Sequence, residues 1–138
     1  MAPMADTQVH TGACLCGAVK YTVNGKLRPV IYCHCEQCRR TSGHFVAATA
    51  AEREELLIEA SEHLRWYQSS NLARRGFCDL CGASLFWDSK DQGHVSIMAG
   101  TLDDSGSLVA EEHIYVDFKG GYYEIGDSLP QKTSHEWQ

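Results

Sequence analysis

The sequence predicts an all-β domain of antiparallel sheets, and two observations carry this prediction. The apolar segments are short and rich in β-branched and aromatic residues, which is the composition of strands. Turn dipeptides stop these segments, and Asn24-Gly25 is the clearest of them. A length of 138 residues is most simply explained by one domain that can bury its own core.

Six segments have strand composition, and in chain order they are 18–23, 29–32, 45–49, 83–87, 94–98 and 113–118. The region 52–68 is ambiguous, because its first half is rich in helix formers. Apolar residues nevertheless alternate through it, as at Leu56 and Ile58 and again at Leu64 and Trp66. This period of two predicts two strands that form a hairpin with its turn at 61–63.

The chain is expected to divide into a loose leader at 1–9, a single zinc-binding domain at 10–128 and a C-terminal tail at 129–138. A formal charge of −6 argues against a general affinity for nucleic acid. No segment approaches the roughly 20 apolar residues of a membrane span, and the N-terminus does not resemble a secretory signal. We therefore expect a cytoplasmic protein that is a monomer or a homodimer and has no nucleic-acid or membrane partner.

The seven cysteines stand in three tight groups and are the most informative feature of the chain. In a reducing cytosol such groups are typical of metal ligands rather than disulfides. The first group ends in Cys16-Gly17 and the third in Cys81-Gly82, where a glycine lets the backbone turn tightly with positive φ. The first and third groups together predict a closed structural zinc site made by Cys14, Cys16, Cys78 and Cys81.

The middle group supplies three ligands, Cys33, Cys35 and Cys38, and no cysteine remains for a fourth. Zinc with three protein ligands and one exchangeable position is typical of catalytic sites. Three thiolates leave the site electron-rich, which suits a chemistry where a bound thiol loses its proton and attacks an electrophile. Arg39 and Arg40 follow directly and are predicted to bind a carboxylate of the substrate.

Other interpretations of these residues stay open at this point. His34 or His44 would close the middle site and make it purely structural, and an iron–sulfur cluster would use one distant cysteine. His44 is also a guess for the donor to a developing alkoxide. The weaker candidates are Ser42 as a ligand contact, Phe45, Trp66, Phe86 and Trp87 as a pocket lining, and Asp103-Asp104 as paired carboxylates; no role is assigned to His63, His94 or His113.

The motifs resemble those of the glutathione-dependent formaldehyde-activating enzyme family, which includes centromere protein V. The residues that carry the resemblance are Thr11-Gly12, Cys14, Cys16-Gly17, Val19 and Tyr21; Cys33-His34-Cys35, Cys38-Arg39-Arg40 and Ser42-Gly43; and Phe77-Cys78, Cys81-Gly82, Leu85 and Gly100-Thr101-Leu102-Asp103-Asp104. The resemblance covers roughly residues 10–126. The chain departs from the family after its last strand, where it has Gly120-Gly121-Tyr122-Tyr123 in place of a frequent tryptophan.

The resemblance implies an all-β architecture of antiparallel sheets, sometimes called a β-tent, with two zinc ions at its edge. It implies a structural zinc on the first and third cysteine groups and a catalytic zinc on the middle group. The implied activity is that of a carbon–sulfur lyase, which condenses formaldehyde with glutathione or catalyses the reverse. The alternatives are a zinc-stabilised binding module without catalysis, and an enzyme of the same fold that acts on another thiol or carbon–sulfur compound.

Overall fold

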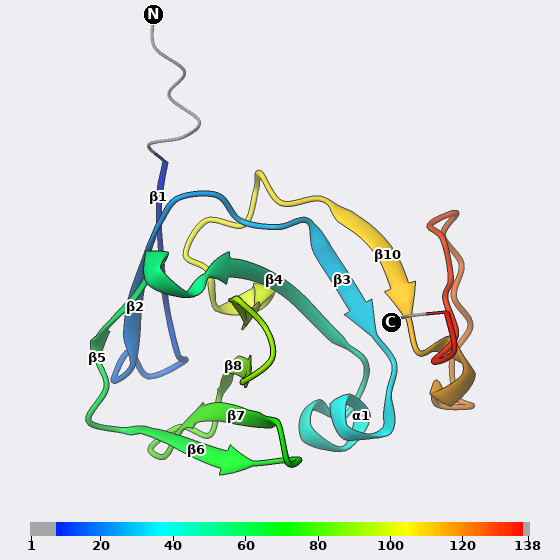
Figure 1. The fold of residues 1–138 in the computed structure, drawn as a ribbon, viewed down its shortest axis with the longest axis horizontal. Helices are drawn as coiled ribbons and strands as arrows, with labels where there is room; N and C mark the ends of the chain where they lie inside the picture. The colour runs from blue at the N-terminus through cyan, green and yellow to red at the C-terminus, as the bar shows by residue number, and fades with distance from the viewer. Residues whose placement is uncertain (1–7, 137–138) are drawn as a thin grey trace, which may run out of the picture.

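The computed structural model describes residues 8–136 and contains mainly short strands (Figure 1). The strands are β1 (Val9–Ala13), β2 (Lys20–Asn24), β3 (Val30–Cys33), β4 (Val46–Glu52), β5 (Leu56–Ala60), β6 (Leu64–Gln68), β7 (Ala73–Cys78), β8 (Ser84–Ser89), β9 (His94–Met98) and β10 (Ala110–Ile114). The helical elements are α1 (Glu36–Ser42) and three single turns, η2 (Arg53–Glu55), η3 (Ala99–Thr101) and η4 (Val116–Phe118). The predicted all-β class is confirmed.

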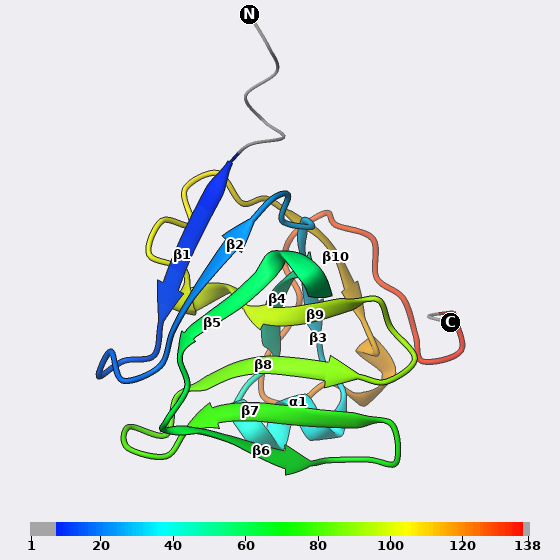
Figure 2. The same ribbon diagram turned by 60° about the vertical axis from the view of Figure 1, so that its left-hand side comes forward.

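The strands form two sheets. The small sheet has the order β1-β2-β5, and the large sheet has the order β10-β3-β4-β9-β8-β7-β6. All pairings are antiparallel except that of β10 with β3, which is parallel. Figure 2 shows the strands of the small sheet running obliquely beside the large one.

The principal core joins these two sheets. Tyr21 of β2 and Phe86 of β8 meet edge to face, with ring centroids 5.3 Å apart. Such aromatic pairs contribute more than their buried area alone. The ring of Tyr21 also lies over Gly12 in β1, where the Cβ of an alanine would stand 2.2 Å from the phenol oxygen. Gly12 therefore permits the close approach of β1 to β2.

The strand predictions for 56–60 and 64–68 are confirmed, but the predicted hairpin between them is wrong. β5 pairs with β2 in the small sheet, and β6 pairs with β7 in the large one. Alternation is a local signal that gives each strand its buried face, whereas the partner of a strand depends on contacts distant in sequence. The chain thus passes from one sheet to the other at residues 61–63.

Two strands and helix α1 were not predicted. β1 and β7 carry glycine or charged residues that depart from strand composition, and α1 is only 7 residues long. Helix α1 begins after Cys35, whose sulfur accepts a hydrogen bond from the N–H of Cys38, and it ends at Gly43 with φ of 88°. The helix is thus delimited by a metal-ligand candidate at one end and a left-handed glycine at the other.

The two ends of the chain were predicted to lie outside the domain. Residues 1–7, which make up most of the predicted leader, lie outside the described residues, while Val9 begins β1. The predicted tail is in contact with the domain, because the carbonyl of Pro130 accepts a hydrogen bond from the N–H of His113 in β10. Within the described range, no helix is long and apolar enough to cross a membrane.

Candidate metal centres

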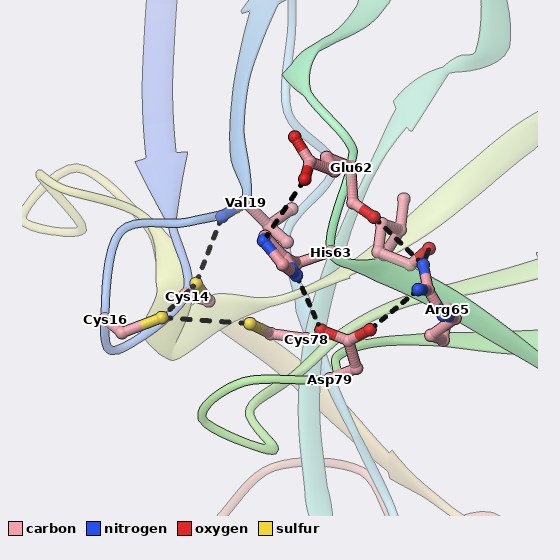
Figure 3. Close-up of polar contacts among 9 residues, drawn as sticks. Cys14, Cys16, Val19, Glu62, His63, Arg65, Cys78 and Asp79 are labelled. Carbon is pink, nitrogen blue, oxygen red and sulfur yellow. Dashed lines mark hydrogen bonds and ion pairs between the residues drawn. The ribbon is translucent and has the colours of Figure 1, made fainter.

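The first and third cysteine groups meet as predicted. Cys14 and Cys16 lie in the β1–β2 loop, Cys78 ends β7, and Cys81 lies in the following turn. Their sulfur atoms all lie within 4.8 Å of one another. The sulfur of Cys16 is 3.7 Å from that of Cys14 and 3.8 Å from that of Cys78 (Figure 3). A tetrahedral zinc with Zn–S bonds of about 2.3 Å requires sulfur separations of about 3.8 Å, so this donor set fits zinc.

The backbone around these sulfurs also has the predicted form. Gly17 and Gly82 adopt φ of 82° and 79°, which confirms the expected left-handed turns. The N–H of Val19 donates a hydrogen bond of 3.2 Å to the sulfur of Cys14. The N–H groups of Ala83 and then Cys16 lower the pKa of the Cys81 thiol to about 6. Backbone donors that face sulfur favour the thiolate form that a metal requires.

A polar cluster supports the third cysteine group from outside. The carboxylate of Asp79 accepts from His63 and from Arg65, each at 2.9 Å (Figure 3). The N–H of Asp79 donates to the carbonyl of His63 at 2.8 Å. His63 had no role assigned from sequence, because its partner is distant in the chain. The cluster fixes the residue that directly follows Cys78.

Replacing Asp79 with alanine is expected to loosen this turn. Because the three side chains are partly exposed, the free energy of unfolding should fall by only about 1 kcal/mol. The variant should release the zinc ion of the four-cysteine site to a chromophoric chelator about tenfold faster than the wild-type protein does. Groups that orient metal ligands change metal affinity by about this factor. Asp91→Ala serves as an exposed control, and equal zinc release from both variants would contradict the prediction.

The middle cysteine group forms a second cluster at the end of β3 and the start of α1. The sulfur atoms of Cys33, Cys35 and Cys38 all lie within 4.8 Å of one another. Contacts with Cys33 and then Cys38 lower the pKa of Cys35, whereas contacts with Cys35 and then Cys38 raise the pKa of Cys33. This soft, compact set of three sulfurs fits zinc.

Among residues 8–136, no fourth histidine, cysteine or carboxylate ligand atom joins these three sulfurs. His34 points away from them and bonds to Tyr123 and His113. The Nδ1 atom of His44 lies 2.8 Å from the hydroxyl of Tyr122 instead. Neither histidine closes the site, which leaves the three-ligand arrangement expected of a catalytic centre.

The arginines near the middle cysteine group have different surroundings. Arg40 pairs with Glu36 at 2.9 Å on the exposed face of α1, and Arg39 lies near Tyr123, whose pKa it affects. Arg75 of β7 instead reaches the cluster, with its Nη2 atom 3.8 Å from the sulfur of Cys38. The Nε atom of Arg75 is buried and has no hydrogen-bond partner. The alternation of side chains along β7 could have indicated from sequence that Arg75 and Arg74 point to opposite faces of the strand.

Tyr115 is a second residue that the sequence did not reveal. It directly follows β10, whose last residue pairs with Cys33 of β3. Its φ of 58° is positive, an uncommon conformation for a bulky side chain that is found most often at functional sites. Burial, followed by the charges of Cys33 and Cys35, raises the pKa of its phenol. A hydroxyl group therefore lies within electrostatic reach of the three sulfurs.

The weaker sequence candidates have structural roles. The hydroxyl of Ser42 donates to the carbonyl of Cys38 at 2.7 Å and caps the end of α1. Asp103 accepts from Thr11, while Asp104 accepts from Gly106, so the two carboxylates diverge. Of the aromatic candidates, Phe86 lies in the core and Trp66 stacks on it, whereas Phe45 contacts His34 and His44.

Comparison with known proteins agrees with this geometry. A family model described as "Glutathione-dependent formaldehyde-activating enzyme" matches residues 9–118. A protein of Schizosaccharomyces pombe named an uncharacterized lyase is 32% identical over 129 residues, which cover 92% of this chain and 93% of the relative. A crystal structure of a Rhodobacter sphaeroides protein is similar with a TM-score of 0.57 and 26% identity, and covers 72% of this chain and 98% of that one. The chain therefore belongs to the glutathione-dependent formaldehyde-activating enzyme family.

Proposed function

We propose that the protein is a zinc-dependent carbon–sulfur lyase that adds a thiol, glutathione, to a small aldehyde such as formaldehyde, or catalyses the reverse. The observation that carries this proposal is the cluster of Cys33, Cys35 and Cys38, which offers three ligands where a closed site would offer four. The family description and the name of the yeast relative support a lyase-type activity. The four-cysteine site is assigned to a structural zinc, and the three-cysteine site to a catalytic zinc.

The chemistry follows from the donor set. Cys33, Cys35 and Cys38 would hold the zinc ion, which would favour the thiolate form of a substrate thiol and leave its sulfur nucleophilic. In the forward direction the sulfur forms a bond to the carbonyl carbon, and the electron pair of the C=O bond moves to oxygen, which takes up a proton. The reverse direction breaks the same carbon–sulfur bond.

The surrounding side chains supply charge and a proton donor. Arg75 lies against Cys38 and offsets the negative charge of the thiolates. Arg39 and Arg40 remain our candidates for contacts with the carboxylates of glutathione. Arg40 would then leave its exposed ion pair with Glu36 and bind a carboxylate of the substrate. The phenol of Tyr115 replaces His44 as our candidate donor to the alkoxide oxygen, because Tyr115 directly follows Ile114, the residue of β10 that pairs with Cys33.

The decisive experiment measures zinc per chain, with and without glutathione, together with X-ray absorption at the zinc edge. The proposal expects two zinc ions and one additional sulfur ligand when glutathione is present. Two saturated zinc sites that ignore thiols would favour a binding module instead. Gain of a sulfur ligand from another thiol, but not from glutathione, would favour a related enzyme with a different substrate.

Arg75 provides a more specific test. Replacing Arg75 with glutamine is expected to lower kcat/KM for the thiol about 10- to 100-fold, since a charged hydrogen bond is worth roughly 1.5–3 kcal/mol. Arg75→Lys, which keeps the charge, should retain more activity. Arg74→Gln is the matched control, because Arg74 lies on the same strand but bonds to Asp88 at 3.0 Å. An equal loss in both glutamine variants would argue against a role for Arg75.

We also place the protein in the cytoplasm, as a monomer or a homodimer, without nucleic-acid or membrane partners. All seven cysteines are free thiols, which is compatible with a reducing compartment. Size measurement in solution and fractionation of cells would test these assignments.

A further inference from the structure

A buried histidine lies behind the three-cysteine site. His34 stands between Cys33 and Cys35 in sequence, yet only 1% of its surface is exposed. Successive residues of an extended segment point to opposite sides. Cys33 packs against the buried cluster of Cys38, Val46 and Ala48, whereas the ring of His34 packs against Phe45, His113 and Tyr123. The metal-binding loop is thus fixed on both of its faces.

His34 belongs to a continuous chain of hydrogen bonds. Its Nδ1 atom lies 2.5 Å from the hydroxyl of Tyr123, and its Nε2 atom lies 2.8 Å from Nδ1 of His113. The Nε2 atom of His113 lies 2.9 Å from a carboxylate oxygen of Asp127. The chain therefore connects the cysteine loop to a residue of the C-terminal segment.

The chemistry of the end groups sets the direction of these bonds. A carboxylate can only accept, so Nε2–H of His113 donates to Asp127. Nδ1 of a neutral His113 then accepts from Nε2–H of His34, and Nδ1 of a neutral His34 accepts from the hydroxyl of Tyr123. Every ring nitrogen has one partner, and the orientation of His34 is determined.

The far end of the chain is itself anchored. The N–H of His113 donates to the carbonyl of Pro130 at 2.9 Å, and the N–H of Lys132 donates to the carbonyl of His113 at 2.8 Å. The N–H of Leu129 donates to the carboxylate of Asp127 at 3.0 Å. Figure 1 shows this C-terminal segment, in orange and red, beside β10. The segment thus acts as a fixed support for the two histidines.

We propose that Asp127, His113 and His34 form a positioning chain through which the C-terminal segment holds the Cys33–Cys38 loop in its metal-binding shape. Tyr123 completes the chain at the second ring nitrogen of His34. The backbone of the loop is tied to the same support, since the N–H of His34 donates to the carbonyl of Ile114 at 3.0 Å. These residues touch neither substrate nor metal and act through the orientation of the loop.

This inference rests on the proposed catalytic metal site, but not on the identity of the thiol or aldehyde. Without an acceptor at Asp127, the proton on Nε2 of His113 loses its partner, and neither ring is held in one tautomer. The three sulfurs would then sample positions unsuited to a shared ion. Loss of a group that orients ligands typically weakens metal affinity about 10- to 100-fold.

The test follows the release of each zinc ion to a chromophoric chelator from the full chain. Asp127→Ala is expected to accelerate release from the three-cysteine site at least about tenfold, while release from the four-cysteine site stays unchanged. Asp127→Asn, which keeps an acceptor oxygen, should restore slow release. The Cys35→Ser variant identifies which kinetic phase of zinc release belongs to which site. The absorption spectrum of the Co²⁺-substituted protein provides an independent readout of ligand geometry.

Asp117→Ala is the matched control, because Asp117 also anchors the C-terminal segment but bonds to the N–H of Ser134 at 2.8 Å. Equal acceleration in both alanine variants, or unchanged release in Asp127→Ala, would overturn the positioning chain. His113→Phe keeps a ring of similar size and should also accelerate zinc release from the three-cysteine site. If His113→Phe does not fold, the result for Asp127→Ala alone tests the proposal. A wild-type protein that binds only one zinc ion would refute the proposed three-cysteine metal site. This outcome distinguishes failure of the proposed function from failure of the positioning chain.

Discussion

Replacing Cys35 with serine is expected to abolish thiol–aldehyde turnover while the domain stays folded. The three-cysteine cluster would lose one of its ligands, and two protein ligands do not hold zinc in the manner of known catalytic sites. Serine is a preferred N-cap residue, so it should still accept the hydrogen bond that Cys38 donates at the start of α1. The variant should contain one zinc per chain and show only the uncatalysed rate of the thiol–aldehyde reaction.

The control for this variant is Ser42→Ala, which alters the other end of the same helix. Ser42 caps the final turn of α1, and its hydroxyl bonds to the carbonyls of Cys38 and His44 rather than to a sulfur. It should keep two zinc ions and most of the turnover. A Cys35→Ser protein that retained turnover after losing one zinc would show that the three-cysteine site is not catalytic.

Replacing Cys78 with serine is expected to have the largest effect on stability. Cys78 has no exposed surface, ends β7, and its sulfur lies 3.8 Å from that of Cys16 in the β1–β2 loop. Structural zinc sites contribute about 10–16 kcal/mol in small zinc domains, which is comparable to the about 5–15 kcal/mol of a whole domain. The variant should therefore be largely unfolded at 25 °C, as measured by circular dichroism and urea titration.

Metal removal tests the same link in the wild-type chain. A strong chelator should unfold the protein, and added zinc should restore its spectrum, because the four-cysteine site joins the small sheet to the large one. Cys35→Ser is the matched substitution, since it changes the same residue type at the other site. If Cys78→Ser unfolded at the same urea concentration as Cys35→Ser, the four-cysteine site would not be the main contributor to the stability of the fold.

The cysteine groups show how far local spacing reaches. Spacings of one or two residues, followed by Gly17 or Gly82, predicted compact loops whose sulfurs meet, and the structure agrees. The direction of the His34 side chain follows an equally local rule, because neighbours in an extended segment diverge. In each case the signal lies within a few residues, where backbone geometry alone sets direction.

Where the prediction failed, the cause is contact between distant segments. The alternation at β5 and β6 is real, yet their partners are β2 and β7 rather than each other. Arg75 faces the three-cysteine site only because β7 lies where its alternate side chains reach α1. The positive φ of Tyr115 likewise follows from the turn after β10. Because the residue at this position is not glycine, the sequence does not indicate this conformation.

The sequence by itself determined the strand-rich class, the family and the two sets of cysteines that could hold a metal ion. These properties depend on residue type and short-range spacing, which a chain carries before it folds. The tertiary structure alone decided which strands pair, which arginine reaches the sulfurs, and how Asp127 connects through His113 to His34. Those outcomes depend on long-range packing, where a side chain finds its partner only after the sheets have formed.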